Sequence, residues 1–247
     1  MTSGAALALY CLGTGRGATA VHGDGASSAF LLLVDDSPVL LVDIGFGVVR
    51  ACRDAFGALP AQILVTHNHS DHAAELPVTL AEAAAAGRRP RVIAGPEVAP
   101  RLREHRLHEL RSTGRPLSAF CDLVVPDGPC ELGQGLRLTL LRARHAEPCY
   151  GFLLSRHDRP VLGYGGDSGV CESLYGQVFR APTVVLDARE RGSPEHAGFA
   201  EVAAFARGYP DRRVYVTGYG TAAQAPGNGL ASLRPGMRLP LAAGVAA

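Results

Sequence analysis

Three histidines and one aspartate fall within six consecutive residues of this chain: His67, His69, Asp71 and His72. Imidazole nitrogens and carboxylate oxygens both suit a borderline metal ion such as Zn²⁺. In extended backbone, residues two apart project to the same side, so His67 and His69 could bind one ion. Asp71 and His72 follow around a turn and could serve a second ion. Two ions about 3.5–4 Å apart hold a water between them and make it a hydroxide near neutral pH.

The residues around this motif predict how it is positioned. Residues 63–65 are β-branched or aliphatic, which predicts a buried strand. The polar residues 66–71 predict a turn, and the helix-forming residues from Ala73 onward predict a helix. The histidines would then lie at the end of a strand, where a turn can direct several side chains at one point. A solvated loop that is merely rich in histidine is the alternative, and the fixed spacing disfavours it.

The order His67-x-His69-x-Asp71-His72 after a strand resembles the signature of the metallo-β-lactamase superfamily. The resemblance extends over nearly the whole chain and implies an α+β fold, the αββα four-layer sandwich. In that fold two mainly antiparallel sheets stack face to face, helices cover the outside, and the metals lie at one sheet edge. We expect a single domain over residues 1–247, with a loose C-terminal tail from about residue 222.

Two further ligands follow from the resemblance. His145 comes after the predicted strand 136–143, and residues 148–152 are similar to a run in the ribonuclease Z branch. Asp167 lies in a Gly-Asp-Ser-Gly element, where a carboxylate on a glycine-rich strand end can bridge two ions. The alternatives are a surface role for His145 and, for the glycine-rich element, the nucleophile of a trypsin-like protease, which nothing else in the sequence supports. The implied ligands are His67, His69, His145 and Asp167 for the first ion, and Asp71, His72 and Asp167 for the second.

Two more residues match functional positions of the superfamily. In ribonuclease Z-like relatives a histidine just before a helix is catalytic, and His196 precedes the predicted helix 199–207. It could protonate the leaving group as a general acid, or it could simply cap that helix. Asp43 resembles the family's Asp-x-Gly acid, which orients a ligand from the second shell. Its alternative is to cap the predicted helix 48–56, and the sequence leaves both roles open.

The chain departs from the pattern at Gly218, where relatives usually carry a histidine that completes the second ion. The second ion would then keep three protein ligands and an open position, which still suits catalytic zinc. One lost ligand should weaken that site, unless His196 substitutes for it. A third possibility is that this protein no longer catalyses hydrolysis.

Composition excludes several classes of protein. The net charge of +1 gives no field that would attract nucleic acid or a membrane. All basic residues are arginine, and the absence of lysine excludes Schiff-base and phosphate-loop mechanisms. The six scattered cysteines predict reduced thiols in a cytoplasmic protein, and no apolar run reaches the roughly 18 residues of a membrane span. The arginine-rich residues 88–115 could attract an anionic substrate, although an ordinary solvated helix face is favoured.

The sequence therefore predicts a metal-dependent hydrolase. A metal-bound hydroxide would attack a phosphodiester or a related small-molecule ester, with Asp71 and His196 as catalytic residues. The cofactor would be Zn²⁺, one or two ions, with Mn²⁺ or Fe²⁺ as substitutes. No insertion is long or basic enough to grip a transfer RNA, so a small anionic substrate is favoured, acted on by a monomer or a homodimer. The alternatives are a biosynthetic enzyme for a lactone or thioester, and a non-hydrolytic metal-binding or ligand-sensing protein.

Overall fold

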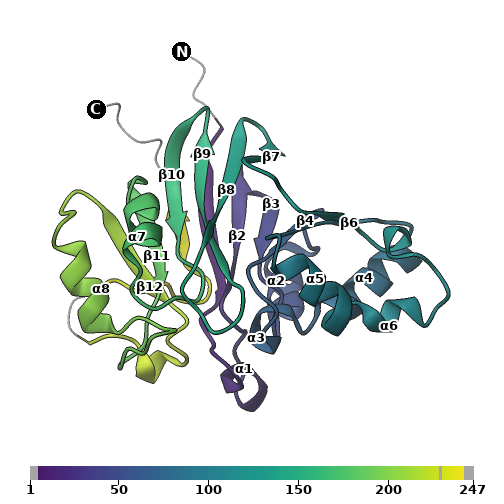
Figure 1. Ribbon diagram of the computed structural model, residues 1–247, viewed down its shortest axis with the longest axis horizontal. Coiled ribbons are helices and arrows are strands. Elements are labelled where there is room, and N and C mark those ends of the chain that lie inside the picture. Colours follow the sequence, from purple (N-terminus) through teal and green to yellow (C-terminus); the bar gives the residue numbers. More distant parts are fainter. Residues whose placement is uncertain (1–4, 228–229, 242–247) are drawn as a thin grey trace. The chain divides into compact units, whose positions relative to one another are not determined.

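The computed structural model describes residues 5–227 and 230–241 (Figure 1). Contacts between these residues divide them into two units. The first unit takes the described residues up to Pro126 together with Pro235–Pro240, and the second takes those from Asp127 to Arg234. Each unit is built on one β-sheet with its own helices, as expected for an α+β protein.

The first unit contains a seven-stranded sheet in the order β13-β1-β2-β3-β4-β5-β6. Its strands are β1 (Leu7–Gly13), β2 (Ala29–Val34), β3 (Ser37–Val42), β4 (Gln62–Val65), β5 (Arg91–Ala94), β6 (Asp122–Val124) and β13 (Arg238–Pro240). All six residues of β2 are buried, which explains its uninterrupted apolar sequence. The hairpin of β2 and β3 turns at Asp35 and Asp36, whose φ angles of 47° and 64° are those of a tight turn between twisted strands.

The helices of the first unit are α1 (Thr19–His22), α2 (Val48–Phe56), α3 (Ser70–Ala73), α4 (Leu76–Ala85), α5 (Val98–Arg101) and α6 (His108–Arg111), with a π-helix at Leu102–Arg106 and a 3₁₀ turn at Leu117–Ala119. Helix α1 lies between the antiparallel strands β1 and β2, and the other helices connect parallel strands. In Figure 1, α4, α5 and α6 lie together beside the β4–β6 end of the sheet. Helical structure between α5 and α6 is continued by this π-helix of five residues. The prediction of a plain turn over 66–71 is wrong, since α3 begins at Ser70.

The second unit contains a six-stranded sheet in the order β12-β11-β10-β9-β8-β7. Its strands are β7 (Cys130–Gly133), β8 (Leu136–Arg142), β9 (Tyr150–Arg156), β10 (Arg159–Tyr164), β11 (Thr183–Asp187) and β12 (Arg213–Thr217). Its helices are α7 (Glu172–Val178), which the sequence did not predict, and α8 (Phe199–Ala206), and a 3₁₀ turn occupies Ala222–Gln224. Rings of Tyr175, Phe179 and Phe205 pack at centroid distances of 4.9–6.2 Å and form the core beneath these helices.

Two expectations about the strands need correction. Both sheets are mixed: the β3-β4-β5-β6 and β10-β11-β12 pairings are parallel, so antiparallel pairings are half of those in the first sheet and three of the five in the second. Helical crossovers separate most of these strands, and a crossover returns the chain in the same direction. The segment after residue 222 is also not wholly loose, since β13 pairs with β1 in antiparallel register.

The thiols agree with the sequence analysis. All six cysteines are free, and five of them are buried. Burial raises the pKa of the Cys11 thiol to about 12 and those of Cys52 and Cys121 to about 11, which leaves these sulfurs protonated at neutral pH. Among the described residues, no helix has the length and apolar character needed to cross a membrane.

Candidate metal-binding site

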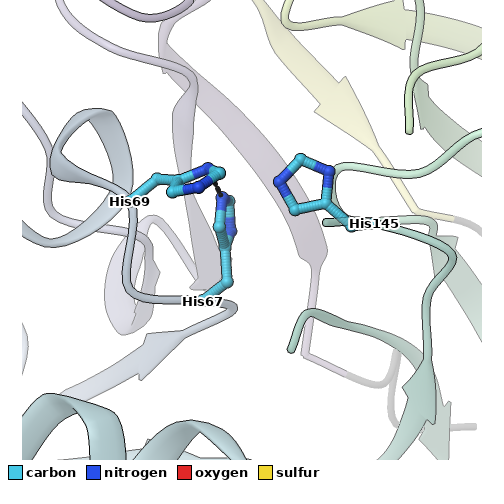
Figure 2. Close-up of side chains that lie close together, drawn as sticks. All are labelled: His67, His69 and His145. Atoms are coloured by element: carbon cyan, nitrogen blue, oxygen red, sulfur yellow. Dashed lines mark hydrogen bonds between the residues drawn. The ribbon is translucent and has the colours of Figure 1, made fainter. Parts of the chain in front are cut away.

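The histidine motif begins where the buried strand β4 ends. His67 is fully buried, and its Nδ1 lies 3.0 Å from the hydroxyl of Thr66. The Nε2 of His67 lies 3.1 Å from Nδ1 of His69, a hydrogen bond that is dashed in Figure 2. The two imidazoles therefore converge on one point, as the spacing of two residues predicted. Convergence of this kind is what two ligands of the same ion require.

A buried carboxylate holds the last histidine of the motif in place. Asp43 follows β3 with a φ of 64° and is fully buried. It accepts hydrogen bonds from the backbone N–H of Thr66 at 2.8 Å, from the Thr66 hydroxyl at 2.9 Å, and from Nδ1 of His72 at 2.8 Å. Burial raises the pKa of Asp43, and His72 opposes that shift. With Nδ1 donating to Asp43, the ring presents Nε2 as its lone-pair nitrogen, as metal-binding histidines do.

This contact decides between the two roles predicted for Asp43. The N-terminal cap residue of α2 is Gly47, which has no side chain that could accept a hydrogen bond from the first turn. The carboxylate of Glu75 accepts the backbone N–H groups of Gly47 and Val49 at 2.7 and 2.8 Å and so satisfies the start of the helix. Asp43 therefore orients a histidine and does not cap α2.

Asp71 lies in the first turn of α3, next to His72. Its Oδ2 accepts the backbone N–H of Gly17 and lies 3.7 Å from Nε2 of His72. The close approach of this segment also explains the glycine in the Asp-x-Gly motif. A Cβ at Gly45 would lie only 1.8 Å from the carbonyl oxygen of Asp71, so only glycine fits there.

In the second unit, three side chains of the types that bind metals lie close together. His145 follows β8, Asp167 follows β10, and His196 lies in the loop before α8. One ligand atom from each lies within 4.8 Å of the other two. Nδ1 of His145 donates to the carbonyl of Glu195 at 3.2 Å, and the rings of His145 and His196 lie 4.9 Å apart. The predicted ligands His145 and Asp167 are therefore neighbours, and His196 joins them.

A second buried carboxylate supports this cluster. Asp187 is the last residue of β11, and its Oδ2 lies 2.6 Å from Nδ1 of His196. Burial, and then the nearby carboxylate of Asp167, raises the pKa of Asp187 to about 6. The guanidinium of Arg189 lies 3.9 Å from Oδ2 of Asp167 and adds positive charge beside the cluster.

The donor types and their supports fit a divalent metal. Within the first unit the motif supplies His67, His69, Asp71 and His72; within the second unit the donors are His145, Asp167 and His196. In both units a histidine donates Nδ1 to a protein acceptor, which selects the tautomer that a metal binds. Mixed imidazole and carboxylate donors favour zinc and neighbouring transition metals over calcium or magnesium. His105 and His108 are exposed and belong to none of these groups of potential ligands.

The sequence analysis missed two residues that position these donors, Asp187 and Arg106. In the sequence Asp187 is simply the last residue of an apolar strand. Asp43 also lies at the end of a strand, and this shared position is the signal that could have identified Asp187. Arg106 belongs to an arginine-rich stretch that reads as a solvated face. In the structure its Nη2 donates to the carbonyl of Asn68 and to the hydroxyl of Ser70, both at 2.8 Å, so it fastens the loop that carries the motif.

Replacing Arg106 with alanine should lower the free energy of unfolding by about 1–2 kcal/mol, because two charge-assisted hydrogen bonds to a partly exposed loop are lost. Arg103 offers a matched control, since it is an exposed arginine of the same π-helix. Arg103→Ala should change stability by less than about 0.5 kcal/mol. Urea denaturation of the three proteins measures both values, and equal stability of the two variants would contradict the proposed fastening.

Comparison with known proteins places this arrangement in a family. The model of the family described as "Anti-Pycsar protein Apyc1" matches residues 7–228. Curated proteins give no match. Among solved structures, the metallo-β-lactamase fold protein YhfI from Bacillus subtilis is 16% identical with a TM-score of 0.74, covering 96% of this chain and 99% of its own.

Two further structures have the same fold at similarly low identity. A diphosphatase of the PhnP family is 16% identical with a TM-score of 0.70, covering 96% of this chain and 97% of its own. The short form of human tRNase Z is 18% identical with a TM-score of 0.71, and the match covers 95% of this chain and 99% of the tRNase Z chain. The α+β class and the metallo-β-lactamase fold predicted from the sequence are thereby confirmed. The chain belongs to the family of the anti-Pycsar protein Apyc1.

Proposed function

We propose that this protein is a metal-dependent hydrolase of phosphodiesters and that its substrate is a cyclic nucleotide. The proposal rests on two hydrogen bonds in which a buried carboxylate orients a histidine. They join Asp43 to His72 and Asp187 to His196. Buried carboxylates are costly, and they are retained where they orient a side chain for chemistry. The proposed ligands are the four motif residues together with His145 and Asp167, and the proposed ion is zinc.

The substrate class rests on the named relatives. One structure with the same fold is a diphosphatase and another is a tRNase Z, so this fold carries hydrolysis at phosphorus in both. The family name refers to Pycsar, which points to cyclic nucleotide degradation. A cyclic nucleotide is a small anionic phosphodiester, which agrees with the size and charge expected from the sequence.

Each side chain has a definite task in this proposal. Bound zinc would supply an activated water and positive charge for the phosphoryl oxygens. Asp43 holds Nδ1 of His72, and the Glu195 carbonyl holds Nδ1 of His145, which leaves Nε2 of each ring available to bind an ion. Two roles fit His196 when Asp187 holds its Nδ1: proton donor to the leaving oxygen, as the resemblance implies, or ligand.

The test is a substrate panel run on protein purified without chelator. We expect bound zinc and hydrolysis of bis-p-nitrophenyl phosphate and of 2′,3′- or 3′,5′-cyclic nucleotides. Chelator should abolish both, and added zinc should restore them. Turnover of lactones or thioesters alone would favour the biosynthetic alternative instead. One tightly bound ion with no turnover on any ester would favour a ligand-sensing protein.

A further inference from the structure

We infer that His196 is a metal ligand in this chain and that it supplies the donor which Gly218 cannot. The inference rests on the proposed function and concerns only residues of the second unit. It joins His196 to His145 and Asp167 as a set of three protein ligands, and it gives Asp187 the task of positioning His196.

Gly218 cannot carry a side chain while its neighbour keeps the observed position. It follows β12 with a φ of 67°, a conformation that residues with a Cβ adopt only at a cost. A Cβ built there would lie 2.4 Å from Oδ1 of Asp187. Strands β11 and β12 run side by side, with Asp187 opposite Thr217. The space that a side chain at position 218 would enter is therefore filled by the carboxylate of Asp187.

That carboxylate is committed to His196. Asp187 is only 3% exposed, and its Oδ2 lies 2.6 Å from Nδ1 of the histidine. Its Oδ1 is buried without a hydrogen-bond partner in the structure. A buried carboxylate oxygen without a hydrogen bond lowers the stability of the fold. The position of Asp187 is therefore better explained by its role in orienting His196 than by a contribution to stability. With Nδ1 donating to Asp187, His196 presents Nε2 as its lone-pair nitrogen.

The loop around His196 also restricts where the imidazole can go. The carbonyl of His196 accepts the N–H of Ser193 at 2.7 Å, and its own N–H donates to the Ser193 hydroxyl at 3.1 Å. The next residue, Ala197, donates its N–H to the carbonyl of Ser168 at 2.9 Å, directly beside Asp167. The backbone thus fastens His196 to the segment that carries Asp167. A ligand held in this way loses little conformational entropy on binding metal.

The first unit contains the same device around His72. There a buried carboxylate that follows a strand, Asp43, holds Nδ1 of the histidine at 2.8 Å. In the second unit Asp187 ends a strand and holds Nδ1 of His196 at 2.6 Å. His72 is a proposed ligand from the motif, and the shared arrangement indicates the same role for His196. One nitrogen of its ring lies within 4.8 Å of ligand atoms of His145 and Asp167, and Nδ1 lies 3.7 Å from Oδ2 of Asp167. The ring is therefore close enough to both residues to complete a ligand set with them.

The experiment compares zinc binding by wild-type protein, His196→Gln and Asp187→Asn, with His22→Gln as control, since His22 is exposed on α1. Bound zinc is measured by elemental analysis after dialysis at fixed free zinc, and Co²⁺ spectra report the coordination. We expect His196→Gln to lose one ion or to bind it at least about 10–100-fold more weakly, and Asp187→Asn to fall between it and the control. Unchanged zinc stoichiometry, affinity and Co²⁺ spectrum in His196→Gln would overturn the inference and favour the general acid.

A second measurement needs no variant and therefore stands if His196→Gln does not fold. Diethyl pyrocarbonate is applied to wild-type protein without and with zinc, and modified histidines are mapped by mass spectrometry. A ligand is protected by zinc, so we expect His196 to become unreactive while His22 stays reactive. Equal modification of His196 in both states would overturn the inference. Wild-type protein that binds no zinc at all would instead refute the proposed function, which keeps the two failures apart.

Discussion

Replacing His72 with alanine is expected to lower the free energy of unfolding by about 3 kcal/mol, because it leaves the buried carboxylate of Asp43 without the Nδ1–H donor of His72. The loss is limited to this value because Asp43 keeps its hydrogen bonds from Thr66. The same change removes a proposed zinc ligand. We therefore also expect activity to fall by more than the 10–100-fold that loss of an outer support causes.

The coupling between these two residues can be measured with a double-mutant cycle. Asp43→Asn removes the charge that His72→Ala leaves unpaired. The double variant should thus be more stable than the sum of the single changes predicts, by about 1 kcal/mol or more. Urea denaturation of metal-free proteins gives the cycle, with His22→Ala as a surface control. Strict additivity would mean that the 2.8 Å contact contributes nothing to stability.

Gly218→Ala is expected to cost about 3 kcal/mol of stability. The left-handed backbone accounts for roughly 1 kcal/mol, and the contact between the new Cβ and Oδ1 of Asp187 accounts for the rest. Restoring histidine at this position should therefore not rebuild a metal site, because the backbone and Asp187 both oppose it. We expect Gly218→His to bind less zinc than the wild type, since displacement of Asp187 also releases His196.

Gly87 provides the matched control for this prediction. It has a similar φ of 70°, but a Cβ there would have nothing within 4 Å. Gly87→Ala should thus show the backbone cost alone, and the difference between the two alanine variants isolates the contact with Asp187. Thermal melts of the metal-free proteins measure both. Equal melting temperatures for the two variants would show that Asp187 moves aside without cost.

The ligand residues could be predicted because their chemistry is concentrated in one short stretch. His67, His69, Asp71 and His72 are recognisable by type and spacing, and the strand before them is recognisable by its apolar run. The helix 48–56 was also predicted, and its boundaries agree with α2 residue for residue. The strand β13 and the short helices α1, α3 and α7 were not predicted.

The supporting residues could not be predicted, because their partners are distant in sequence. Nothing local distinguishes Asp187 from any acid that ends a strand until the loop returns His196 to it. Arg106 reads as one of several solvated arginines, and only the π-helix brings its guanidinium to the motif loop. An apolar pattern of helical period does not reveal a change from i+4 to i+5 hydrogen bonding. For Asp43 the sequence left two roles open, capping α2 or orienting a ligand. The contact with His72 shows that it orients a histidine.

The strand β13 has a consequence for how the protein is made. It completes the first sheet by pairing Ala8 of β1 with Pro240, while residues Asp127–Arg234 of the second unit lie between them in the sequence. During translation β1 leaves the ribosome long before this partner exists. An apolar strand with unsatisfied N–H and C=O groups along one side is a template for pairing with another chain. The nascent polypeptide therefore carries an aggregation-prone edge strand until residues 238–240 have emerged. Chaperones that shield exposed edge strands should raise the yield of folded protein.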